Sequence, residues 1–299
     1  MNIRFGDEVR RAFENGSPVV ALESTIISHG LPYPQNLDAA KNAERIIRQN
    51  HAIPATIAVI DGELCAGLSE SEIEMLATRP DIRKISTRDL PIALAKKLTC
   101  ATTVATTSFI ADRAGIKVFA TGGIGGVHRG GANDVSADLP MLAKTPITIV
   151  CSGAKIILDL SATREWLETN GVTILGYKCD ELPAFYSRSS GLYVDQRADS
   201  VSEITSIIRC RNELGLKNAV LVTVPVPVDF EVNSEDLDTI LQTSLKKARQ
   251  NNILGKELTP FLLSEMSRLS GGKTLAANIA LFENNARIAA KIAVSLDKR

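Results

Sequence analysis

Two charged residues stand directly after apolar runs, where their side chains could do acid–base and nucleophilic chemistry. Glu23 follows the run 18–22, and Lys155 follows the run 147–151 and three small residues. A carboxylate at the end of a buried strand is a candidate general acid or base, although a Glu here can also cap the next segment. Small and apolar neighbours remove water from Lys155, and desolvation favours the neutral amine that acts as a nucleophile. The alternative is a lysine whose stem lies along the apolar residues while its amine reaches solvent.

A glycine-rich stretch, 118–138 (VFATGGIGGVHRGGANDVSAD), lies between these two residues in the sequence. Glycine lets the backbone approach a ligand closely and adopts positive φ without strain, so consecutive N–H groups can point at one anion. His128 and Arg129 add charge-assisted donors that suit a phosphate. Asp134 and Asp138 are hard oxygen ligands of the kind that Mg²⁺ or Mn²⁺ prefers. The stretch predicts a phosphate and metal site, or else a glycine-rich connection whose acids cap the next helix.

The common nucleotide-cofactor patterns are absent. A dinucleotide fingerprint that starts at Gly123 and Gly125 would need a third glycine where the chain has His128. The one candidate P-loop, which ends in Gly272-Lys273-Thr274, has Ser267 in place of its first glycine. Any phosphate site in this chain is therefore of another kind.

Apolar runs and helical spacings alternate along the chain in strand, loop and helix order. The spacing predicts strands at 18–22, 55–60, 116–120, 147–151, 172–175 and 219–224. It predicts helices at 36–50, 70–78, 99–114, 163–169, 234–250, 259–269 and 274–295, and another directly after Lys155. Asp61-Gly62 predicts a hairpin turn. Repeated strand–helix units favour a three-layer α/β/α fold with a mainly parallel or mixed central sheet, in a single catalytic domain over 1–299.

The composition excludes several classes of partner. The 299 residues include 34 basic and 34 acidic side chains, so no overall field attracts nucleic acid or an anionic membrane. No apolar run approaches the length of a membrane span, and the first residues do not have the form of a secretory signal. Five scattered cysteines indicate reduced thiols. We expect a cytoplasmic protein that binds neither nucleic acid nor membrane.

Several long stretches give the chain a resemblance to a known family. VVALESTIISHGLPYPQN, KISTRDLP, AGIKVFATGGIGGVHRG, CSGAKIILDL and ANIALFENNA, among others between about residues 18 and 290, resemble the pseudouridine-5′-phosphate glycosidases, a family that also contains indigoidine synthase A. The resemblance implies reversible cleavage of the C–C glycosidic bond of pseudouridine 5′-phosphate into uracil and ribose 5-phosphate. It also implies a divalent metal, Mn²⁺ in preference to Mg²⁺, and a homotrimer.

The resemblance also implies roles for individual residues. Lys155 takes the place of the lysine that attacks C1′ of the ribose, Glu23 that of the proton donor, and Asp134 that of the metal ligand. His128 and Arg129 keep their positions as candidate phosphate contacts. The run 130–133 is shorter than expected for the bacterial enzymes. The remaining substrate contacts fall on Lys84, Val104, Ser136, Ala137, Asp138 and Asn278.

A lysine nucleophile suits this reaction because the leaving atom is a ring carbon of uracil. An imine between Lys155 and an opened ribose supplies an electron sink, so that C–C cleavage resembles a retro-aldol step. Three other functions remain open on the sequence alone. They are an aldolase-like lyase that uses the same lysine, a non-catalytic sensor of phosphorylated metabolites, and a role of the glycosidase-like protein in pigment synthesis.

Overall fold

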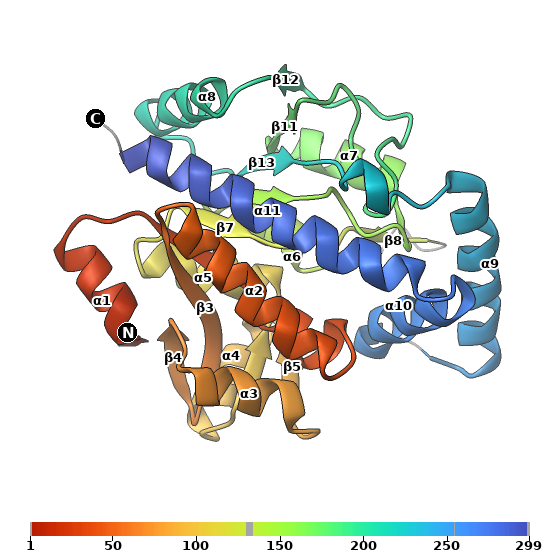
Figure 1. The fold of residues 1–299 in the computed structure, drawn as a ribbon, viewed down its shortest axis with the longest axis horizontal. Helices are drawn as coiled ribbons and strands as arrows, with labels where there is room; N and C mark the ends of the chain where they lie inside the picture. Colours follow the sequence, from red (N-terminus) through yellow and green to blue (C-terminus); the bar gives the residue numbers. More distant parts are fainter. Residues whose placement is uncertain (1, 130–133, 254, 298–299) are drawn as a thin grey trace.

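The computed structural model describes residues 2–129, 134–253 and 255–297 (Figure 1). The short run 130–133 lies outside the described residues. Within them, eleven strands form one sheet in the order β1-β4-β3-β2-β7-β9-β13-β11-β12, with β6 paired to β3 and to β5. These strands are β1 (Ile3–Phe5), β2 (Val19–Leu22), β3 (Ile53–Ile60), β4 (Glu63–Ala66), β5 (Arg83–Ile85), β6 (Cys100–Thr102), β7 (Val118–Ala120), β9 (Thr148–Cys151), β11 (Thr173–Tyr177), β12 (Gln196–Ala198) and β13 (Val220–Thr223). A small separate pair joins β8 (Val127–His128) to β10 (Leu158–Asp159).

Strand β3 connects two parts of the sheet because its two halves pair differently. Its first half, 53–56, runs parallel to β2, whereas its second half, 57–60, runs antiparallel to β4 and β6. The predicted turn at Asp61-Gly62 is confirmed, since Ile60 pairs with Glu63 across it. From β2 to β12 every neighbouring pair of strands is parallel. The predicted mainly parallel or mixed sheet is therefore confirmed.

Helices cover both faces of this sheet. On the nearer face in Figure 1, α11 packs on β2, β7 and β9 and lies between α2 and α8, while α5 and α6 lie behind the sheet. Helices α9 and α10 pack on each other, and α10 also contacts the first part of α11. The α-helices are α1 (Asp7–Glu14), α2 (Gln35–Gln49), α3 (Glu70–Thr78), α4 (Leu90–Ala95), α5 (Val104–Arg113), α6 (Asp138–Leu142), α7 (Leu160–Thr169), α8 (Val201–Glu213), α9 (Ser234–Gln250), α10 (Leu258–Leu269) and α11 (Lys273–Asp297).

Four shorter helical turns complete the described elements. They are the π-helix η1 (Ile26–Gly30) and the 3₁₀ turns η2 (Thr87–Asp89), η3 (Val228–Phe230) and η4 (Gly255–Glu257). None of the described helices is long and apolar enough to span a bilayer.

One helix begins later than the sequence predicts, and one predicted helix does not form. The helix predicted at 99–114 starts at Val104, because Cys100–Thr102 forms β6 and Thr103 caps the helix by accepting a hydrogen bond from the Thr106 N–H. The helix predicted directly after Lys155 is wrong. Residues 158–159 pair with β8 instead, and α7 begins at Leu160 with Asp159 as its cap.

Candidate active site

The predicted catalytic residues meet at the carboxyl ends of three neighbouring parallel strands. β2 lies beside β7, and β7 lies beside β9. Glu23 directly follows β2, the glycine-rich loop follows β7, and Lys155 lies four residues beyond the end of β9. This edge of a parallel sheet is where α/β proteins bind ligands, and it brings together residues more than a hundred positions apart in the sequence.

Glu23 is buried, and both of its carboxylate oxygens have a hydroxyl partner. Thr25 donates a hydrogen bond to Oε2, and Thr121, the residue after β7, donates one to Oε1. Glu23 has only 5% of its surface exposed, and Thr121 is fully buried. Two fixed donors hold the carboxylate in one orientation, as a proton-transfer group requires.

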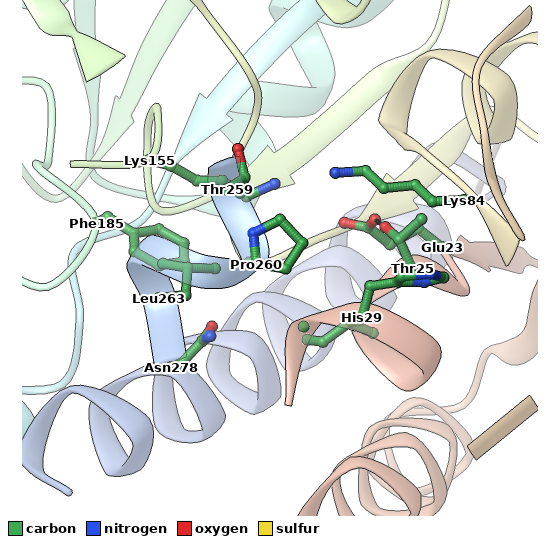
Figure 2. Close-up of a pocket in the computed structure, with 14 residues that line it drawn as sticks. Glu23, Thr25, His29, Lys84, Lys155, Phe185, Thr259, Pro260, Leu263 and Asn278 are labelled. Atoms are coloured by element: carbon green, nitrogen blue, oxygen red, sulfur yellow. Dashed lines mark hydrogen bonds between the residues drawn. The ribbon is translucent and has the colours of Figure 1, made fainter. Parts of the chain in front are cut away.

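Two lysines approach this carboxylate from opposite sides. Lys155 comes from the loop after β9 and Lys84 from β5, and their amines extend toward each other across the pocket (Figure 2). Within the described part of the chain neither amine makes a hydrogen bond or an ion pair that would neutralise it. Burial lowers the pKa of Lys84, and repulsion by Lys155 lowers it further, against the opposing attraction of Asp138, Glu23 and Glu257.

Two cavities meet at these groups. The first, of about 40 Å³, is narrow and has a largely apolar wall with Phe185 and Leu263. The second, of about 460 Å³, is lined mostly by residues with polar or charged side chains, so we call it the polar cavity, and it falls within the size range of small-molecule sites. The residues that line both cavities are Glu23, Thr25, Lys84, Lys155 and Thr259.

The wall of the narrow cavity contains a strained backbone and a buried amide. Phe185, which is 1% exposed, has φ 63°, a conformation that bulky side chains rarely adopt. Such strain concentrates at functional sites. Asn278 of α11 is 5% exposed and lines the narrow cavity, and its amide forms no hydrogen bond with the described residues. A buried amide that lines a cavity without a partner is a candidate ligand contact.

Five N–H groups in the described part of the glycine-rich loop are already used within the protein. The N–H groups of Thr121, Ile124, Gly125, Val127 and His128 all donate to acceptors within the protein. None of the described loop glycines, 122, 123, 125 and 126, has a positive φ. Gly123, Gly125 and Gly126 are required for close packing instead; a Cβ on Gly125, for example, would collide with Ser136 and Asp138. These five N–H groups are therefore not free to hold a phosphate, and the phosphate nest stays a prediction for the other N–H groups of the loop.

Asp138 ties this loop to helix α5. Its Oδ1 accepts a hydrogen bond from the Ala105 N–H and its Oδ2 accepts one from the Gly125 N–H, each at 2.8 Å. The residue is 6% exposed and lines the polar cavity. Val104, Ser136 and Ala137 line the same cavity.

The other predicted contacts are divided between the cavity and its surroundings. His128 lines the polar cavity, as does Asp134, whose surface is exposed. Arg129 lines neither cavity and donates to the Ile156 carbonyl at 3.3 Å. Among the described residues no group of three His, Cys, Asp or Glu side chains is placed to hold a metal ion. A single carboxylate still suits Mg²⁺ or Mn²⁺, because such ions keep several water ligands and also bind substrate phosphates.

Several lining residues were not predicted from the sequence. Thr25, two residues after Glu23, lines both cavities, and its hydroxyl so close to Glu23 was a usable signal. Thr121 lines neither cavity but donates to Glu23. His29, on η1, and Phe185 also line the narrow cavity. Thr259, Pro260 and Leu263 come from α10, where helical spacing indicates only a packed face.

The fold and this site define an α/β/α enzyme whose pocket combines two amines with one buried carboxylate. The chain belongs to the family of indigoidine synthase A like proteins, whose model matches residues 8–295.

Relatives and solved structures resemble the chain over nearly its whole length. It is 50% identical to a pseudouridine-5′-phosphate glycosidase of Caldanaerobacter subterraneus subsp. tengcongensis over 298 residues, and this match covers 99% of this chain and 97% of that protein. It is 51% identical to a pseudouridine-5′-phosphate glycosidase of Geobacillus kaustophilus over 294 residues, and this match covers 98% of each protein.

Two solved structures have the same fold, each 37% identical over 99% of this chain and 97% of the other. One is an indigoidine synthase A-like protein of Thermotoga maritima, with a TM-score of 0.91. The other is the prealnumycin C-glycosynthase in complex with ribulose 5-phosphate, with a TM-score of 0.90.

Proposed function

We propose that this protein reversibly cleaves the C–C glycosidic bond of pseudouridine 5′-phosphate to give uracil and ribose 5-phosphate. The observation that carries the proposal is that a polar and a largely apolar cavity meet at Glu23, Lys84 and Lys155. A C-nucleotide also has a polar and a less polar part, since its reacting bond joins a phosphorylated sugar to a flat base. The names of the relatives support this substrate, and the ribulose 5-phosphate bound by a structural relative supports a sugar-phosphate site.

The phosphorylated sugar fits the polar cavity. Lys84, Arg88 and His128 supply positive or donor groups to its wall. The start of α5 also contributes there, because the first N–H groups of a helix lack intrahelical acceptors. Asp138 and Thr103 occupy the N–H groups of Ala105 and Thr106, which leaves that of Val104 to face a ligand.

The base points toward the narrow cavity. A cavity of about 40 Å³ is smaller than one of roughly 150 Å³ that holds a benzene ring. A pyrimidine ring therefore enters only if the wall moves. The side of the wall formed by Pro260 and Leu263 belongs to α10, which packs on α9, α11 and η1. Asn278 then offers its amide to the polar edge of the ring.

Lys155 and Glu23 divide the chemistry between them. The neutral Lys155 amine bonds to C1′, the C1′–O4′ bond breaks with its electron pair on O4′, and Glu23 transfers a proton to that oxygen. The lysine nitrogen, which is an ammonium after the attack, gives one proton back to Glu23, and Glu23 delivers it to uracil C5. The freed lone pair of that nitrogen then forms C1′=N while the C1′–C5 electrons remain with uracil, where they make the new C5–H bond. Water hydrolyses the iminium, which releases ribose 5-phosphate and restores the lysine.

The proposal includes a divalent metal, Mn²⁺ in preference to Mg²⁺. Asp134 would hold the ion with one carboxylate, and water and substrate oxygens would complete its coordination. The bound ion would orient and neutralise substrate oxygens in the polar cavity. We also propose a homotrimer in the cytoplasm, which rests on the family resemblance. Light scattering on the purified protein tests the trimer.

The first experiment incubates the protein with pseudouridine 5′-phosphate and Mn²⁺ and follows uracil release. Wild type should release uracil, and Lys155→Ala should release none. Borohydride reduction with ribose 5-phosphate should trap a covalent adduct on wild type and none on the variant. If wild type neither releases uracil nor makes pseudouridine 5′-phosphate from uracil and ribose 5-phosphate, the proposed reaction is wrong.

A further inference from the structure

The loops after β7 and β9 remain paired beyond the ends of these two strands. The Ser152 N–H donates to the Gly122 carbonyl at 2.9 Å, and the Lys155 N–H donates to the Ile124 carbonyl at 3.1 Å. The backbone of Lys155 is therefore held against the glycine-rich loop. Any group that fixes the start of both loops also fixes Lys155 relative to that loop.

Asn285 of α11 makes hydrogen bonds to both loops where they leave the sheet. Its Nδ2 donates to the Thr121 carbonyl at 2.9 Å and to the Ser152 hydroxyl at 3.1 Å, with a longer contact of 3.4 Å to the Gly122 carbonyl. The Ser152 hydroxyl also donates to Oδ1 at 3.4 Å. Asn285, Thr121 and Ser152 are all fully buried. Buried carbonyls and hydroxyls need partners, and this one side chain supplies a partner to each loop.

Both catalytic residues are connected to Asn285 through these contacts. Thr121, whose carbonyl accepts from Asn285, holds Glu23 through its hydroxyl. Ser152 precedes Lys155 by three residues in the same loop. Asn285 is not among the described residues that line either cavity. Any effect of Asn285 on the reaction is therefore exerted through its neighbours.

The face of α11 that carries Asn285 also carries a residue of the pocket. Asn278 stands seven residues earlier, which is two turns of the helix, and lines the narrow cavity. The helix packs on β2, β7 and β9 (Figure 1). Asn285 thus lies on the element that connects the cavity wall to the two catalytic loops.

We propose that Asn285 is a positioning residue that holds the two loops at one fixed separation and thereby aligns Glu23 with the Lys155 amine. The inference rests on the proposed function, in which the amine attacks C1′ while Glu23 transfers a proton to O4′ of the same sugar. These two sugar atoms are bonded to each other, so both groups must be placed together, and a misplacement of about 1 Å can cost roughly 100-fold in rate. Hydrogen bonds from residues behind a site provide this precision.

Asn285→Leu tests this role, because leucine has the branched shape of asparagine without its donors and acceptor. In the assay of uracil release, kcat should fall roughly 10- to 100-fold below that of wild type. KM should stay within about twofold of wild type, because the lost contacts position catalytic groups and do not bind the substrate. A rise in KM with kcat unchanged would overturn the inference.

Asn218→Leu is the matched control. Asn218 likewise donates to two backbone carbonyls, those of Ala143 and Asn170, at 2.9 and 2.7 Å. It stands before β13, whereas the pocket lies beyond the opposite ends of the parallel strands. We expect both variants to lower the urea midpoint of unfolding and only Asn285→Leu to lower kcat. If the two folded variants have equal kcat, Asn285 only stabilises the fold and the inference is wrong.

Hydrogen exchange measures the two loops without any substrate. The N–H groups of Ser152 and Lys155 are bonded to the other loop, so their exchange reports whether the loops stay together. Peptides that contain them should exchange roughly tenfold faster or more in Asn285→Leu. They should keep the wild-type exchange rate in Asn218→Leu. Exchange at the wild-type rate in Asn285→Leu would show that Asn285 does not hold the loops.

Ser152→Ala decides the question if Asn285→Leu does not fold. It removes one hydroxyl and leaves the hydrogen bond from Asn285 to the Thr121 carbonyl in place. Borohydride trapping of ribose 5-phosphate on Lys155 should slow roughly 2- to 12-fold, and trapping at the wild-type rate would contradict the inference. Failure of wild type to release uracil would refute the proposed function, while hydrogen exchange would still decide whether Asn285 holds the loops.

Discussion

Thr121→Val should reduce catalysis by removing one of the two hydroxyls that hold Glu23. Valine has nearly the shape of threonine, and Thr121 is fully buried, so the change leaves Oε1 of Glu23 without its donor and with little room for water. A hydrogen bond to a charged group contributes about 1.5–3 kcal/mol. At about 1.36 kcal/mol for each factor of ten in rate, kcat should fall roughly 10- to 150-fold if Glu23 must keep this orientation.

The assay is uracil release at saturating pseudouridine 5′-phosphate, with Thr121→Ser as the matched control. Serine keeps the hydroxyl and loses only a methyl group, so its kcat should stay close to that of wild type. Glu23→Gln sets the lower limit of activity. If Thr121→Val retains kcat within twofold of wild type while Glu23→Gln is inactive, the carboxylate does not depend on this hydroxyl and the reasoning is refuted.

Three further outcomes are expected. Chelation of metal ions with EDTA should abolish activity, and added Mn²⁺ should restore it. Asp134→Asn should raise the Mn²⁺ concentration for half-maximal activity roughly tenfold or more. Unchanged activity after complete metal removal would contradict the metal site. Asp138→Asn places an amide against two backbone N–H donors, so urea denaturation should show a loss of about 1.5–3 kcal/mol in the free energy of unfolding. A loss below about 0.5 kcal/mol, as expected for an exposed substitution, would show that the fold does not need the hydrogen bonds of Asp138 to Ala105 and Gly125. Hydrogen bonds from Arg268 and Lys247 lower the pKa of Glu265 from 4.5 to about 2, so the carboxylate stabilises the fold fully above pH 4.5 and loses this effect as the pH falls through 2. The difference in free energy of unfolding between wild type and Glu265→Gln should therefore shrink as the pH is lowered from 4.5 to about 2. A difference that grows as the pH falls would contradict the prediction.

The sequence predicts most of the elements that place the catalytic residues. Continuous apolar runs are typical of parallel strands buried on both faces, and the runs ending at Leu22, Ala120 and Cys151 all proved to be neighbouring strands. Helix α8 was missed, although Ser200 accepts a hydrogen bond from the Glu203 N–H and this Ser-x-x-Glu spacing is a usable start signal.

Contacts between distant residues are what the sequence does not predict. Nothing in its spacing pairs Thr121 with Glu23 or brings Lys84 to Lys155, because these contacts depend on strand order. The glycine-rich loop shows a second limit. A glycine can serve a ligand or a tightly packed neighbour, and at Gly125 only the position of Asp138, thirteen residues away, distinguishes the two.

The divided pairing of β3 fixes the position of Lys84 relative to Glu23. Lys84 is connected to the second half of β3 through β5 and β6, and Glu23 is connected to the first half through β2. A slip of one residue in either pairing would displace one group by about 3.3 Å along the strand and turn its side chain to the opposite face. The distance between Lys84 and Glu23 in the pocket therefore depends on the register of this one strand. Substitutions in β3 that never touch a ligand can thus change the catalytic rate.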